Sequence, residues 1–211
     1  MTSRDKILGR LRAVPPPFAD VPPITERALM VPMEGQPLVE TFVQRAKLLS
    51  VDVRQPDSDE EALEAILQII GEDTRVLSWD FAHIPLAGLN TALQTRGISV
   101  ADSRDADVRV GITGVDSALA ATGSVVVSAR EGRPRSVSLL PYVHIVVLRE
   151  SQILPHLEAW IASCAEDSEA FRRIGNHVVI TGPSRTADIA MELVLGAHGP
   201  AALHILAMKD A

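Results

Sequence analysis

Cysteine is almost absent from this sequence, since Cys164 is the only one in 211 residues. No intrachain disulfide can form, and no CxxC or CxxH spacing exists that could hold zinc or an iron–sulfur cluster. Long apolar runs are missing too. No stretch of about 20 apolar residues could span a bilayer, and residues 1–12 lack the apolar core of a secretory signal. These absences predict a cytoplasmic protein without membrane insertion and without a metal site.

Aromatic residues and positive charge are also scarce. Aromatics make up 3% of the chain, and the formal net charge is −7. No basic run is interleaved with aromatic side chains, so nucleic acids and anionic membranes are not expected partners. The sequence lacks a GxGxxG fingerprint for a dinucleotide and a GxSxG elbow for a nucleophilic serine. It therefore leaves the cofactor open.

Proline, in contrast, is concentrated in one segment. Half of the chain's 14 prolines lie between residues 14 and 37, which predicts an extended connector. Residues 2–13 before it have the pattern of an amphipathic helix that is too short to be stable alone. We expect this helix to dock on the core or on a second subunit of a homo-oligomer. The predicted organisation is an arm over residues 1–37 and a domain over residues 38–211.

Residues 38–100 alternate between helical apolar spacing and short β-branched runs. Helices are predicted over 38–49, from Ser58 to Gly71 and from Pro85 to Gly97, and Ser58 with Glu61 forms a capping box. Strands are predicted over 51–53, 75–78 and 98–100. Strictly alternating strands and helices predict an α/β fold, with a parallel sheet and helices on both faces.

After residue 107 the expected strands lie closer together, at 108–112, 125–128 and 144–148. This spacing predicts an antiparallel hairpin inserted beside the parallel sheet. A short helix is expected over 116–121, a longer one over 151–164, and a last strand over 203–207. The polar loop 130–135 is interpreted as a solvated hairpin tip, from which Arg133 and Arg135 could reach an acidic partner.

The stretch 181–188, TGPSRTAD, predicts a site for a small anion. It follows a β-branched run at 177–180, interpreted as a buried strand, and precedes an apolar pattern at 189–195 with helical spacing. Free N–H groups at a helix start favour an anion, and Arg185 adds a fork suited to carboxylate or phosphate. Alternatively, Ser184 and Thr186 only cap the helix and Arg185 pairs with Asp188.

Several other polar turns are expected at the carboxyl ends of strands, where α/β sheets bind ligands. If they converge, Asp116, Asp188 and His198 could transfer protons on a hydroxy or keto acid. The expected ligand-binding residues are Thr113, Thr122, Gly123, His144, Gly182, Ser184, Arg185 and Thr186. Each has a plainer alternative. Asp116 can cap a helix, His144 can be a core histidine, His198 can serve a turn, and Cys164 is more simply an inert packing thiol.

Three segments resemble one known family, the LUD-domain family. They are GITGVDSALAATGS at 111–124, SVSLLPYVHIVVL at 136–148, and ITGPSRTADIAMELVLGAHGPAALHILAM at 180–208. The resemblance extends from about Leu38 to the C-terminus. It implies a Rossmann-like fold similar to the glucosamine-phosphate deaminase, ribose-phosphate isomerase and CoA-transferase group. It also implies a role in oxidising L-lactate to pyruvate beside partner proteins that carry iron–sulfur clusters.

One position departs from the family pattern. Members usually carry Glu immediately before the Thr122-Gly123 pair, where this chain has Ala121. If that Glu serves as an acid, base or nucleophile, this chain lacks the group. The sequence is therefore interpreted first as a component that binds a small anion. The alternatives are an independent enzyme of the sugar-phosphate isomerase or CoA-transferase type, and an assembly subunit without catalysis.

Overall fold

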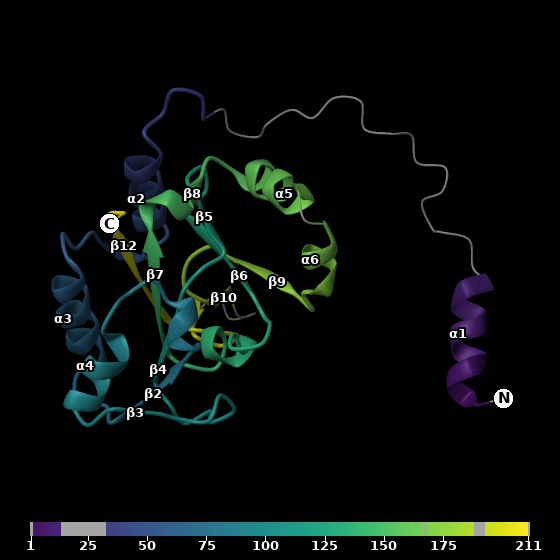
Figure 1. The fold of residues 1–211 in the computed structure, drawn as a ribbon, viewed down its shortest axis with the longest axis horizontal. Helices are drawn as coiled ribbons and strands as arrows, with labels where there is room; N and C mark the ends of the chain where they lie inside the picture. The colour runs from purple at the N-terminus through teal and green to yellow at the C-terminus, as the bar shows by residue number, and fades with distance from the viewer. Residues whose placement is uncertain (1, 14–32, 167, 188–192, 211) are drawn as a thin grey trace. The chain divides into compact units, whose positions relative to one another are not determined.

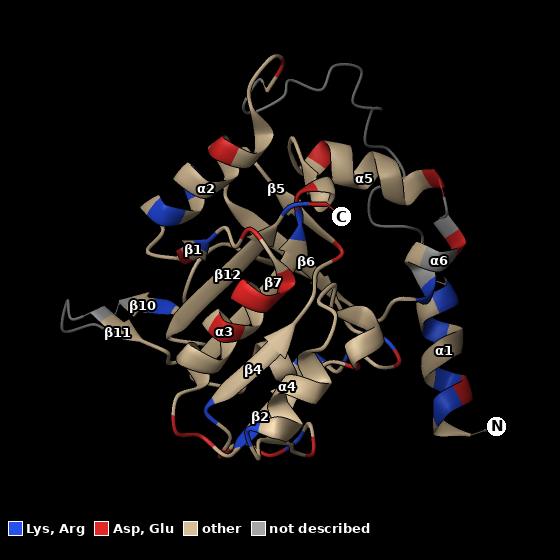
Figure 2. Ribbon diagram, turned by 60° about the vertical axis from the view of Figure 1, so that its left-hand side comes forward, with Lys and Arg blue, Asp and Glu red and all other residues tan. Residues whose placement is uncertain are grey.

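The computed structural model describes residues 2–13, 33–166, 168–187 and 193–210. The chain divides into two compact units, residues 1–30 and 31–211. In the first unit, helix α1 (Ser3–Ala13) forms where the sequence predicts it, carries several Lys and Arg side chains (Figure 2) and buries none of its residues. Most of the proline-rich segment lies outside the described residues, and the domain boundary at residue 37 stays a prediction.

A six-stranded sheet forms the centre of the second unit, and every pair of neighbouring strands in it is parallel. This confirms the predicted α/β fold with a mostly parallel sheet. The strand order is β1-β12-β7-β4-β2-β3, with bounds Asp52–Arg54, Ala202–Met208, Val143–Arg149, Val110–Thr113, Arg75–Ser78 and Ser99–Val100. The central strands β7 and β4 are almost entirely buried, as parallel strands covered on both faces are expected to be.

Helices α3 (Asp59–Ile70) and α4 (Leu89–Thr95) lie together on one face of this sheet (Figure 1). The predicted cap of α3 is present, because the Glu61 amide donates to Ser58 Oγ at 3.2 Å. The reciprocal bond of the capping box is shifted by one residue, since Glu61 Oε2 accepts from the amide of Asp57. Helix α2 (Leu38–Leu48) packs against β1 and the short strand β8.

A second, four-stranded sheet covers the opposite face of the parallel sheet, where helices were expected (Figure 1). Its order is β8-β5-β6-β9, with bounds Ile153–Leu154, Ser117–Leu119, Ser124–Ser128 and His177–Ile180. An antiparallel hairpin, β5–β6, is inserted beside the parallel sheet as predicted, but its strands differ from those expected. Of the three closely spaced strands only 125–128 belongs to it, since 108–112 and 144–148 correspond to β4 and β7, which pair in parallel. Helix α5 (Leu157–Glu166) contacts β5 and β8, and α6 (Ser168–Arg173) follows it.

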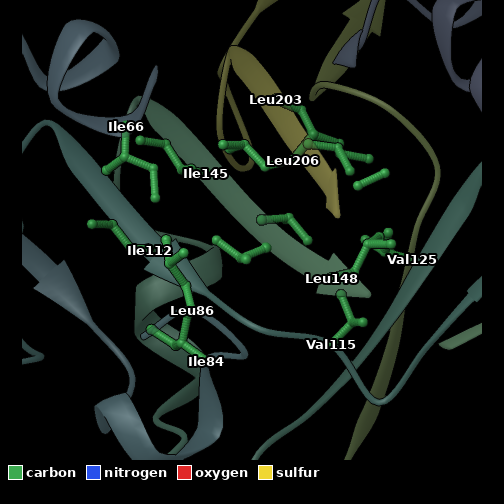
Figure 3. Close-up of a cluster of buried hydrophobic side chains, with 14 of the residues drawn as sticks. Ile66, Ile84, Leu86, Ile112, Val115, Val125, Ile145, Leu148, Leu203 and Leu206 are labelled. Atoms are coloured by element: carbon green, nitrogen blue, oxygen red, sulfur yellow. The ribbon is translucent and has the colours of Figure 1, made fainter. Parts of the chain in front are cut away.

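The main core fills both sides of the parallel sheet. Ile145 lies toward α3, where Ile66 packs, while Leu148 points toward Val125 of the second sheet (Figure 3). A smaller cluster lies on the far face of the second sheet, where Trp160 of α5 packs on Leu119 and Val126. The second sheet thus separates two hydrophobic layers, and both of its faces carry apolar side chains.

Two predicted helices are strands. Residues 116–121 have good helical residues, yet Ser117–Leu119 is β5 because it pairs with β6 and β8, which satisfies its backbone. Of the expected helix 189–195, residues 189–192 lie outside the described residues, and Leu193–Leu195 is strand β11. It pairs antiparallel with β10 (Arg185–Ala187). Residues 185–187 of the predicted anion turn thus form one strand of an antiparallel pair.

Three further boundaries differ from the prediction. Helix α4 begins at Leu89 because Gly88 before it has φ 76°, outside the helical region. The helix expected from residue 151 begins at Leu157, since Pro155 interrupts the pattern and residues 153–154 form β8. The strand 177–180 is half-buried at an edge, with Val179 exposed, although a buried strand was expected. The described residues also form 3₁₀ turns at Phe81–His83, Arg135–Ser138 and Glu150–Gln152.

Candidate functional site

The polar turns whose convergence the sequence left open lie at opposite ends of the parallel sheet. Thr113 is the last residue of β4, and Asp116 follows it at the carboxyl end. The turn at 198–200 precedes β12 and therefore lies at the amino end of the same sheet. The turn that contains Ser184 also lies at the amino end of the sheet, because the Ser184 amide donates to Pro200 O at 2.8 Å. A single site containing both Asp116 and His198 does not form.

Thr113 and His144 form a buried pair on the neighbouring strands β4 and β7. Neither side chain is exposed, and Thr113 Oγ1 lies 2.9 Å from His144 Nε2. Burial lowers the pKa of His144 to about 3, from its ordinary value of 6.5. The imidazole is therefore neutral at physiological pH.

We expect this histidine to make stability pH-dependent. The unfolded chain protonates His144 near pH 6.5, whereas the folded chain does not until about pH 3. Stability therefore falls as the pH drops below 6.5, by about 1.4 kcal/mol per pH unit. Between pH 6.5 and 5, the free energy of unfolding measured in urea should fall by about 2 kcal/mol because of this group. A His144→Gln variant should lack that part of the loss, and an equal loss in both proteins would contradict the assignment.

Thr122 and Gly123 lie at the turn between β5 and β6, beside α2. Hydrogen bonds link three hydroxyls here, from Thr122 to Ser124 at 2.7 Å and from Ser124 to Thr181 at 2.8 Å. Gly123 has φ 66°, and a side chain there would collide with the backbone of α2. Ala121 is buried and donates its amide to Pro155 O. These residues connect the second sheet to α2.

The predicted anion turn has a different geometry from the one expected. Arg185 and Thr186 begin a strand, so the described residues of this turn offer a ligand no helix start and no helix dipole. Ser184 Oγ accepts from the His198 amide at 3.3 Å, and Gly182, with φ 93°, packs against Leu49. Asp188 lies outside the described residues. What the turn presents is the side chain of Arg185.

Arg185 is exposed and borders a cavity of about 470 Å³. Its Nη2 donates to Leu49 O at 2.9 Å, which holds the guanidinium at the cavity wall. Asp52 and His204 share this cavity and bind one another at 2.9 Å. Burial raises the pKa of Asp52, but the His204 hydrogen bond and the charges of Arg54 and His204 lower it more, so the pKa lies below its usual value. His198 borders a separate cavity.

Asp116 belongs to a second cluster that sequence reasoning missed. Its Oδ1 accepts from Arg133 Nη1 at 2.9 Å and from Arg130 Nη2 at 3.2 Å. The Arg133 side chain is only 13% exposed, and its guanidinium lies 5.1 Å from the centre of the Trp79 ring. Arg133 Nη2 also lies 3.4 Å from His83 Nδ1. The loop 130–135 is thus anchored at Arg133, where a solvated tip was expected.

This cluster brings together loops that follow β2, β4 and β6. The acidic partner foreseen for Arg133 is Asp116 of the same chain, 17 positions earlier. Asp116 is accordingly an ion-pair residue and caps no helix, since a strand follows it. In the sequence, the sign of this ion pair is the unusual density of arginine in residues 130–135. Burial and Arg130 lower the pKa of Arg133, while Asp116 raises it.

Within the described ranges, no group of three or more His, Cys, Asp and Glu side chains is placed to hold a metal ion. Nor does any helix in the part of the chain that the structure describes have the length and apolar character to cross a membrane.

The sequence model of the LUD domain matches residues 39–208. Lactate utilization protein C of Macrococcus caseolyticus is 31% identical, over 82% of this chain and 78% of the relative. The protein of the same name from Halalkalibacterium halodurans is 29% identical, over 82% and 80%. The uncharacterized protein YkgG of Escherichia coli K12 is 28% identical, over 96% and 94%.

The fold is also similar to a solved structure. The crystal structure of a DUF162 family protein from Deinococcus radiodurans superposes with a TM-score of 0.57, over 81% of this chain and 96% of that one. The two sequences are 20% identical, so the comparison supports a similar fold and nothing further.

Proposed function

Because the chain belongs to the LUD-domain family, we propose that it is a cytoplasmic component of L-lactate utilisation that binds a small carboxylate through Arg185. Its similarity to relatives named lactate utilization protein C supports a role in this process. The observation that carries the site is the exposed Arg185 side chain, fixed by Leu49 O at the border of a cavity. A guanidinium held in this way can bind a carboxylate through paired hydrogen bonds.

The charges of the cavity fit this ligand. Asp52 is a carboxylate in the lining, and it is bound by His204 and Arg54 at 2.9 and 3.2 Å. Its negative charge is therefore offset within the protein, and Arg185 keeps its attraction for an anion. Ser184 and Thr186 flank the arginine and fix the hairpin backbone on which it stands.

Oxidation of lactate needs an electron acceptor, and we assign that role to iron–sulfur partner proteins. This chain would act beside them as the component without a cluster, since its single cysteine cannot ligate one. An independent enzyme of the CoA-transferase type is the less favoured alternative. Ala121 occupies the position at which an acid–base or nucleophilic Glu would be needed, and a methyl group can perform neither role.

Calorimetric titration with L-lactate and pyruvate tests the carboxylate site. We expect Arg185→Ala to weaken binding by about 10- to 100-fold, the effect of removing a charged hydrogen-bond donor. Arg173→Ala is the matched control, because Arg173 is also exposed and, among the described residues, pairs with Glu169 four residues earlier. It should bind like the wild type. Equal affinity in the Arg185→Ala variant would overturn the site.

Two further outcomes separate the alternatives. If neither acid binds but the chain co-purifies with iron–sulfur proteins, it is an assembly subunit. If the isolated chain turns over a sugar phosphate or a CoA ester, it is an independent enzyme.

A further inference from the structure

A second, smaller cavity of about 170 Å³ lies against the outer face of the four-stranded sheet. Strands β6 and β9 contribute Ser128 and His177 to it, and the loop before β5 contributes Asp116. The α5–α6 region closes it with Trp160, Cys164, Phe171 and Ile174. None of these residues borders the Arg185 cavity, so the two cavities are separate.

Three polar side chains of this cavity have buried atoms that lack a hydrogen-bond partner among the described residues. They are Ser128 Oγ, both ring nitrogens of His177, and Asp116 Oδ2. Ser128 is only 1% exposed, and it stands opposite His177 in the β6–β9 register, so the two side chains project from the same face of the sheet. A buried polar group without a partner costs about 1–3 kcal/mol. Several of them at one cavity favour a site for a polar ligand.

The walls of the cavity suit a flat or compact apolar body. Phe171 and His177 stack at 4.3 Å between ring centres, and Trp160 stands edge-on to them, at 6.0 and 5.4 Å. An apolar cavity of about 150 Å³ is known to admit benzene. A volume of 170 Å³ is thus sufficient for one six-membered ring and far larger than a single water requires.

The unpartnered Asp116 oxygen disfavours a carboxylate in this cavity and does not require a cation. Asp116 Oδ1 is already bound by Arg130 and Arg133, while Oδ2 is the atom without a partner. An anion would face this acceptor oxygen directly. The Cys164 thiol stays protonated, because burial and the charge of Asp116 raise its pKa despite a hydrogen bond with Ser163 that lowers it.

We propose that this cavity binds a small uncharged molecule that carries one hydroxyl group on a ring or a branched apolar body. The hydroxyl donates to one acceptor, Asp116 Oδ2 or a His177 nitrogen, and accepts from Ser128 or the other His177 nitrogen. The apolar body lies among Trp160, Phe171 and Ile174. The ligand is thus different from the carboxylate assigned to Arg185, and either proposal can fail without the other.

Phenol is the probe, titrated into the full-length chain and followed by NMR chemical shifts. We expect phenol to bind with a dissociation constant below about 10 mM. Benzene lacks the hydroxyl and benzoate is charged, so both should bind at least about tenfold more weakly. Comparable binding of benzene would show a merely apolar cavity, and comparable binding of benzoate would show an anion site. Either result overturns the proposal, as does the absence of phenol binding.

Two variants locate the probe. His177→Phe keeps a ring against Phe171 but removes both nitrogens, and Ser128→Ala removes the hydroxyl. Each variant should weaken phenol binding about tenfold. Ser138→Ala is the matched control, because Ser138 is equally buried but its Oγ is bonded to Arg135 O. It should bind phenol as the wild type does. Unchanged affinity in both cavity variants would place phenol elsewhere and reject the site.

Discussion

Replacing Arg133 with Met is expected to lower the free energy of unfolding by about 3–5 kcal/mol, measured by urea denaturation. The change removes the shorter of the two ion pairs of Asp116, at 2.9 Å, and the side chain that lies over Trp79. Asp116 is only 17% exposed and would keep a single partner, Arg130, at 3.2 Å. A largely buried carboxylate without its main partner is costly, because water cannot replace the lost hydrogen bond.

Arg130→Met provides the matched control for this experiment. Arg130 binds the same Asp116 oxygen, but its side chain is 44% exposed, so its loss should cost about 0–1 kcal/mol. The double variant Asp116→Asn with Arg133→Met should be less destabilised than the sum of its single changes, since the two residues interact. If Arg133→Met costs no more than Arg130→Met, the loop 130–135 is not anchored by this pair.

Gly123→Ala is expected to have an effect of similar size, about 3 kcal/mol or more. Gly123 has φ 66°, which costs a residue with a Cβ about 1–2 kcal/mol. A Cβ there would also lie 2.6 Å from Arg45 C and 2.8 Å from Ala46 Cα of helix α2. Because these are backbone atoms, only a shift of the whole helix can relieve the collision, and overpacking of this kind adds about 1–3 kcal/mol.

Gly97→Ala separates the two contributions. Gly97 has nearly the same φ, 70°, and no atom lies within 4 Å of the position of its Cβ. Thermal or urea unfolding of this variant should show the backbone cost alone, about 1–2 kcal/mol. Equal destabilisation at both glycines would mean that α2 does not depend on its approach to the β5–β6 turn.

The parallel half of the fold could be predicted because its signals are local. Ser58 and Glu61 mark the start of α3, and the β-branched run 144–148 marks the buried strand β7. Residues 116–121 misled the prediction for a physical reason. Alanine and leucine favour a helix locally, but strand pairing on both sides of Ser117–Leu119 outweighs that preference.

The candidate sites were harder to predict, because their partners are distant in sequence. Nothing near Arg133 identifies Asp116 as its partner, and nothing near Ser128 identifies His177, which lies across a strand pair. The sequence left open whether Asp116 and His198 meet in space. The structure separates them, because Asp116 follows β4 whereas the 198–200 turn precedes β12.

The position of β12 has a consequence for how the chain reaches its folded state. This last strand lies between β1 and β7, and it joins Asp52 to His204, which are 152 positions apart. Until β12 is synthesised, β1 lacks its partner and one edge of β7 stays open. Such edges recruit other chains, and long-range pairing of this kind folds slowly. Nascent chains that stop before Ala202 should therefore depend on chaperones and aggregate when these are scarce.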